Sequence, residues 1–119
     1  MNKTSTIATV SALFALSPFA LGCDYPQRAD IPNGGTASKD DMLAGQSSVK
    51  AYMAAMDEYL RCIEQQEKDL LAEMTDISED ERANRNAALT KKHNAAVEEM
   101  ELIAARFNEE VRAYKAKAE

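Results

Sequence analysis

The chain has 119 residues, with 14 Lys and Arg against 20 Asp and Glu, so its formal net charge at pH 7 is −6. It contains no Trp and only seven Tyr and Phe residues, which argues against a large mixed core. An acidic surface repels nucleic acid and anionic membranes. We therefore expect no nucleic-acid partner, and membrane contact only if a lipid anchors the chain.

The first 22 residues follow the three-part plan of a secretory signal peptide. Lys3 makes the start positive, residues 7–16 are dominated by apolar side chains, and Ser17-Pro18 leads into small residues up to Gly22. The apolar run is too short for a membrane span, which needs roughly 20 residues. The sequence therefore predicts a signal peptide over residues 1–22 and a periplasmic or secreted protein of the bacterial envelope.

Two cleavage signals overlap at the end of this segment. Ala20 and Gly22 put small residues where an ordinary signal peptidase prefers them, whereas Ala20-Leu21-Gly22-Cys23 is similar to a lipobox, in which the Cys is acylated. The alternative to soluble export is thus a membrane-anchored lipoprotein, lipidated at Cys23. Both interpretations start the mature chain at Cys23, and removal of Lys3 lowers its net charge to about −7.

Residues 23–37 differ in composition from everything that follows. They hold Pro26, Pro32 and the turn signal Asn33-Gly34-Gly35, without a helical period, and predict an extended arm. No Pro occurs from Ser38 onward and Gly45 is the last Gly. Residues 38–119 are rich in Ala, Glu, Lys, Met, Leu and Arg, the composition of long helices.

The first helix is expected over about residues 39–74. Ser38 can cap it, and Asp41, three residues on, can complete a capping box. Apolar residues then recur every seven positions, which is a helical spacing. This row consists of Met42, Val49, Met56, Ile63 and Leu70, and is widened by Tyr52, Tyr59, Met53, Leu60 and Met74.

A turn is expected over about residues 75–78, and a second helix over about 79–117. Ser78 and Glu81 repeat the capping signal. The apolar seam expected on this helix follows an a/d heptad pattern: Val97, Ala104, Val111 and Ala118 with Met100, Phe107 and Tyr114, flanked by Leu89, Ala96 and Ile103. Polar Asn86, Thr90 and His93 occupy seam positions near the turn, so we expect that end to be looser or to contact something else.

Two helices of similar length joined by a short turn fold back on each other. The predicted fold is all-α: an antiparallel, coiled-coil-like hairpin of two long helices with an extended N-terminal arm. A lone hairpin buries one stripe and is marginal at this size. Either the arm packs as a third layer, through Tyr25, Pro26, Ile31 and Pro32, or two hairpins form a homodimer.

Cys23 and Cys62 are the two cysteines of the chain. In an oxidising compartment such a pair suggests one disulfide. About 36 Å of helix separates Ser38 from Cys62, and 15 extended residues span up to about 50 Å, so the arm can reach back. The alternatives are a lipidated Cys23 with free Cys62, or an intermolecular bond through Cys62.

The arm and several helical segments resemble small exported proteobacterial proteins of unknown function. The resemblance rests on residues 23–28 (Cys-Asp-Tyr-Pro-Gln-Arg) and 30–34, and on the segments 42–44, 52–53, 59–62 and 106–114. It implies an ordinary export signal, which favours the disulfide over the lipid. It implies no catalytic residue.

No pattern in the sequence predicts catalysis, a cofactor or a metal centre. His93 has no second ligand or base at a useful helical spacing. Met53 and Met56, one turn apart, could be imagined as a copper site, but their place on the apolar row indicates core. The acidic residues Glu98, Glu99 and Glu101, and likewise Glu64 and Glu67, are interpreted as solvated helix faces. We expect a non-enzymatic protein.

Two non-enzymatic roles fit this architecture. One is a structural or protein-interaction module that binds a protein partner or itself through helix faces. The other is a periplasmic chaperone-like clamp, since Met-containing faces adapt to varied partners. The sequence lacks the repeated Leu-Thr-x-x-Gln motif of helical periplasmic chaperones, which favours the first role.

Overall fold

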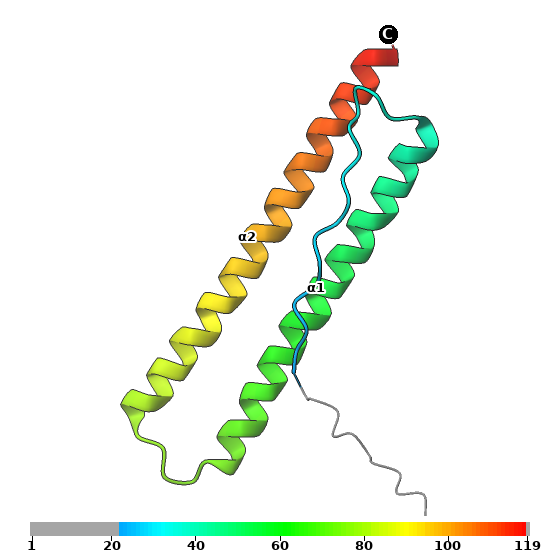
Figure 1. Cartoon of the computed structure of the whole chain (residues 1–119). Coiled ribbons are helices and arrows are strands. Elements are labelled where there is room, and N and C mark those ends of the chain that lie inside the picture. Colours follow the sequence, from blue (N-terminus) through cyan, green and yellow to red (C-terminus); the bar gives the residue numbers. More distant parts are fainter. Residues whose placement is uncertain (1–21, 119) are drawn as a thin grey trace, which may run out of the picture.

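The structure, a computed structural model, describes residues 22–118 and contains two α-helices and no strand within that range. Helix α1 spans Lys39–Glu73 and helix α2 spans Glu79–Ala118, and the two run antiparallel along most of their length (Figure 1). The all-α hairpin fold is confirmed. The signal peptide predicted over residues 1–22 lies, apart from Gly22, outside the described residues.

Both helices begin at serine caps. At α1 the Ser38 hydroxyl accepts a hydrogen bond from the Asp41 amide (3.1 Å), and the Asp41 carboxylate accepts one from the Ser38 amide (2.9 Å). These bonds from Ser38 hold the pKa of Asp41 below its usual range, since they stabilise the charged carboxylate. At α2 the Ser78 hydroxyl accepts from the Glu81 amide (3.1 Å). Capping therefore fixes where each helix starts.

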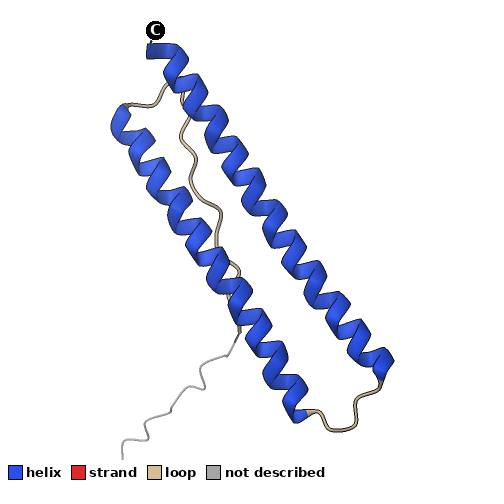
Figure 2. Ribbon diagram, turned by 180° about the vertical axis from the view of Figure 1, so that it is seen from behind, coloured by secondary structure: helices blue, strands red, loops and turns tan. Residues whose placement is uncertain are grey.

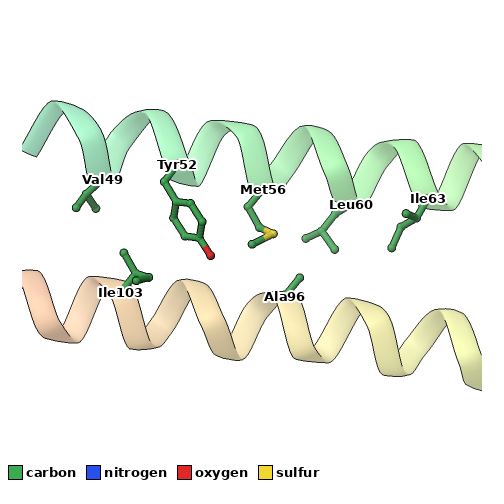
Figure 3. Close-up of a cluster of buried hydrophobic side chains, with 7 residues drawn as sticks. All are labelled: Val49, Tyr52, Met56, Leu60, Ile63, Ala96 and Ile103. Carbon is green, nitrogen blue, oxygen red and sulfur yellow. The ribbon is translucent and has the colours of Figure 1, made fainter. Parts of the chain in front are cut away.

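Helix α1 buries the apolar row that its heptad spacing predicts. The buried residues of this helix are Met42, Gly45, Val49, Tyr52, Met56, Leu60 and Ile63. Met56 lies at the centre, with no exposed surface, and points at α2 together with its neighbours (Figure 3). Leu70, the next member of the row, is 40% exposed, so the buried row ends at Ile63.

Helix α2 turns a different row toward α1 from the one expected. Its fully buried side chains are Ala96 (0% exposed) and Ile103 (1%), which sequence reasoning placed on the flank (Figure 3). The expected seam residues Val97 and Ala104 are half-buried. The seven-residue row through Ala96 and Ile103 continues with Glu110 and Lys117, whose side chains hydrogen-bond the arm. The row was expected as a flank and not as the facing row, since two of these four residues are charged.

The arm, residues 23–37, is the third layer of the fold. It runs back along α1 from the start of that helix, and both views show it lying along the hairpin, in contact with both helices (Figures 1 and 2). Cys23, Ala29 and Ile31 pack against the buried core cluster. Two ways to cover a marginal hairpin were expected, the arm or a second copy. The structure shows the arm packed as a third layer over one face.

The half of the hairpin beyond the arm is packed more loosely. Figure 1 shows both helices continuing past the arm toward the turn. Among the described residues, none between Glu64 and Ala95 is buried. Leu70 and Met74 are 40% and 36% exposed. This agrees with the expectation of a looser end, and Asn86, one of the polar residues expected there, lines the space between the helices.

Candidate functional site

Cys23 and Cys62 are joined in a disulfide that fastens the N-terminal end of the arm to the middle of α1. The S–S distance is 2.01 Å and the Cα atoms are 5.6 Å apart. Cys62 is on the exposed side of α1 and Cys23 is half-buried against the core. The bond therefore fixes where the arm ends along the hairpin.

Two glycines let the arm approach the helices closely. A Cβ atom on Gly34 would overlap the carbonyl oxygen of Glu110 and lie 2.9 Å from the backbone nitrogen of Tyr114. A Cβ atom on Gly45 of α1 would overlap the ring of Pro32. Neither glycine has a positive φ. Both are needed because of space and not because of backbone conformation.

The arm's turn is held to the C-terminal end of α2 by hydrogen bonds. Thr36 and Ala37 donate backbone bonds to the Asn33 carbonyl oxygen, 3.1 and 2.8 Å long, which close the turn. The Gly34 amide donates to the Glu110 carboxylate of α2 (2.7 Å). The Lys117 ammonium donates to the Ala37 carbonyl oxygen. Charge-assisted bonds of this kind are stronger than neutral ones and orient the turn.

A polar and aromatic cluster joins the middle of the arm to both helices. Arg28 forms an ion pair with Glu99 of α2, whose side chain is 17% exposed. The ring of Tyr25 meets that of Tyr59 edge to face, 5.0 Å between centroids. Burial, and after it Glu99 or a neighbouring tyrosine, raises the pKa of both Tyr25 and Tyr52 above the usual range. The cluster fastens the arm to both helices.

A groove lies between the helices on the side of the turn. Its volume is about 760 Å³. The walls combine apolar floor residues with a charged rim; they are formed by Glu64, Glu67, Lys68 and Leu71 of α1 and Glu79, Arg82, Ala83, Asn86 and Leu89 of α2. An ion pair between Arg85 and Glu67 (2.8 Å) holds the helices together here. We call this feature the turn-end groove.

The side of the hairpin opposite the arm continues this groove as a strip of half-buried apolar residues. The arm touches α2 through Glu99, Glu110 and Lys117. Successive residues of a helix are about 100° apart. The expected seam, one position after the row through Ala96 and Ile103, therefore lies about a quarter turn round α2 from that row, on the side away from the arm. We call the open face the turn-end groove together with Met53 of α1 and the half-buried seam residues of α2, which are Val97, Met100, Ala104 and Val111.

The residues weighed for chemistry do not come together. His93 is half-buried on α2, whereas Met56 is fully buried and Met53 packs against the core cluster. Within residues 22–118, no three His, Cys, Asp or Glu side chains are grouped so as to hold a metal ion. The arrangement is suited to holding helices and an arm together, and to presenting an open face.

Sequence reasoning missed two acidic residues that hold the structure. Glu99 and Glu67 were interpreted as solvated, yet each side chain is 17% exposed and ion-paired, with Arg28 and Arg85 respectively. A signal existed for Glu67, which lies four residues after buried Ile63, near the buried row. For Glu99 the partner sits on the arm, so only the position of the arm could reveal it.

No family model, curated protein or solved structure matches this chain. Among the described residues, neither helix is apolar enough over a sufficient length to cross a membrane. The fold and the open face are therefore the basis for a functional proposal.

Proposed function

We propose that this chain is an exported, non-enzymatic protein-interaction module of the bacterial envelope, which binds a protein through the open face of its hairpin. One observation carries the proposal: the arm covers one face of the hairpin, while the opposite face and the turn-end groove keep apolar side chains partly exposed. Contiguous exposed apolar surface rimmed by charge is typical of interaction sites.

The disulfide supports the location outside the cytoplasm. Disulfides persist in oxidising compartments such as the periplasm, and Cys23 and Cys62 are placed for one. The apolar segment of residues 7–16, followed by Gly22, supports export. Export and the disulfide are thus two parts of the same proposal.

The same bond supports a soluble mature protein over a lipoprotein. Lipidation of Cys23 would convert its Sγ atom to a thioether, and an Sγ atom bonded to Cys62 cannot carry that group. The two forms exclude each other chemically. The lipoprotein would have a free Cys62 and an arm that is tethered to the membrane.

A chaperone-like clamp remains the second candidate, because the floor of the turn-end groove includes Leu71, Ala83 and Leu89. A clamp, however, needs enough open surface to hold varied unfolded segments. The groove is confined to one end of the hairpin, and the ion pair between Arg85 and Glu67 joins the two helices beside it. This geometry supports one partner of fixed shape, such as a helix laid along the face.

Site-specific photo-crosslinking in the native host tests the proposal. A photoreactive residue replaces Leu71 in the turn-end groove, and a matched control replaces Asp69, which is also on α1 and exposed but does not line the groove. We expect one discrete adduct from position 71, recovered from the envelope fraction, and none from position 69.

Three results would contradict parts of this proposal. Equal adducts from both positions, or none from position 71, would remove the open face as an interaction site. A ladder of many adducts, with suppression of aggregation by the purified protein, would favour the clamp. Recovery of the chain from the cytoplasm with residues 1–22 attached would exclude export.

A further inference from the structure

Resting on the proposed interaction through the open face, we infer that the partner on this face is a second copy of the chain, giving a two-fold symmetric four-helix bundle with both turns at the same end. When the two-fold axis runs along the hairpins, α1 of one copy lies over α2 of the other. Every helix then has antiparallel neighbours only, as in up-down bundles.

The apolar residues of the open face are placed for the centre of such a bundle. Val97 and Met100 of α2 and Met53 of α1 are half-buried against the core and would be covered by the second copy. A symmetric interface needs a self-complementary surface, and apolar residues from both helices provide it. A second copy would bury these apolar side chains, which a two-helix hairpin with one arm leaves partly exposed.

The charged rim of the open face is also self-complementary. Glu67 and Arg85 form an ion pair, so they lie at the same height along the hairpin axis. Lys50 lies 17 residues before Glu67, and Glu101 lies 16 residues after Arg85. Because the helices are antiparallel, Lys50 and Glu101 also lie at nearly the same height. Both are exposed, Lys50 one turn before Met53 and Glu101 one turn before Ala104. In the two-fold bundle, Lys50 of each copy meets Glu101 of the other.

The arm does not interfere with this assembly. It contacts α2 through Glu99, Glu110 and Lys117 and α1 through Cys62, none of which belongs to the open face. The disulfide and the second copy thus cover different faces. A monomer with its disulfide intact remains able to pair.

Sedimentation equilibrium of the exported, oxidised protein tests the inference. We expect a dimer. Met100→Glu places a charge in the centre of the interface and should abolish the dimer, whereas Leu102→Glu, at a site that is 40% exposed and points away, should leave it intact. Circular dichroism checks that both variants keep their helical content.

A mixing experiment tests the symmetry with exposed residues, whose replacement leaves the fold undisturbed. Lys50→Glu and Glu101→Lys each turn the two rim contacts repulsive, and each alone should weaken the dimer about tenfold, because two attractions between exposed charges become two repulsions. When the two variants are mixed, every contact is again between opposite charges. The mixture should recover the affinity of the unaltered protein by forming heterodimers.

The inference fails if the purified protein is a monomer at high concentration, or if Leu102→Glu dissociates the dimer as Met100→Glu does. It also fails if the mixture is no tighter than the separate variants. A purified monomer that still gives one adduct with a different protein from position 71 in the host would overturn the second copy as partner and leave the proposed interaction role standing. A monomer without any such adduct would overturn both.

Discussion

Single residues decide how closely the arm can lie against the helices. Gly34 is the sharpest case, because its Cα atom rests on the backbone of α2 beside Glu110. The next residue, Gly35, has only the side-chain oxygen of Asn33 within reach of a Cβ atom, at 3.2 Å. The two neighbours therefore offer a matched pair of substitutions.

Gly34→Ala should destabilise the protein by about 1–3 kcal/mol, the usual cost of overpacking, because the arm's turn must move off α2. Gly35→Ala should change stability by less than about 0.5 kcal/mol, since it is exposed and the Asn33 side chain can move. Urea unfolding of the oxidised proteins measures both. Equal midpoints for the two variants would contradict the close approach seen at Gly34.

The tyrosine cluster makes the attachment of the arm sensitive to alkaline pH. Burial first, with Glu99 adding to it, raises the pKa of Tyr25, and burial raises that of Tyr52. Since the folded-state pKa exceeds the unfolded value of about 10, the stabilisation is complete below pH 10 and is lost as pH rises through the folded value. Stability should therefore fall above about pH 10.

Ultraviolet titration of tyrosinate should show this directly. We expect two of the four tyrosines to ionise later than free tyrosine, and Glu99→Gln to lower the pKa of both by removing the nearby negative charge. Tyr52→Phe should remove one late transition. If all four tyrosines titrate together, the cluster does not form as described.

At the scale of the elements, the hairpin could be predicted from the sequence and the exact faces could not. The caps at Ser38 and Ser78 and the row through Met56 are local signals, so α1 begins and packs as its spacing indicates. The facing row of α2 depends on where the arm lies. Glu110 and Lys117 continue that row by their spacing, and their hydrogen bonds to the arm's turn join distant segments, which periodicity does not reveal.

The candidate site also combines features that the sequence could predict with features that it could not. The pairing of Cys23 with Cys62 could be predicted as one alternative, because two cysteines in an oxidising compartment suggest a disulfide and the reach of helix and arm permits it. The looser turn end was signalled by Asn86 and Thr90 in the seam. The ion pair between Arg28 and Glu99 was not, because nothing local to either residue specifies its partner.

The two halves of the hairpin should differ in local stability. Buried residues occur only in the half that the arm covers, within the described chain, whereas residues 64–95 have none. Regions with few buried contacts open at lower free energy. Amide hydrogen exchange of the oxidised protein should be faster around Glu67 and Arg85 than around Met56 and Ile103. Uniform protection along both helices would contradict this division.

For the whole molecule, the disulfide is the single covalent link between the arm and the hairpin. It closes a loop of 39 residues, which on the chain-entropy model is worth about 4 kcal/mol. A domain of this size has only about 5–15 kcal/mol in total. The double variant Cys23→Ala, Cys62→Ala should therefore unfold at markedly lower urea concentration. Reduction of the unaltered protein should have the same effect and should leave the double variant unchanged; a reduced protein as stable as the oxidised one would contradict the role of the bond.

The central claim is that an exported chain begins at Cys23 and folds its arm back onto α1 through that residue. The most direct measurement is the intact mass, without reduction, of the protein recovered from its native host. We expect the mass of residues 23–119 less two hydrogen atoms. A mass raised by acyl chains, or one with two free thiols, would contradict the disulfide-fastened arm, and a mass that includes residues 1–22 would contradict export.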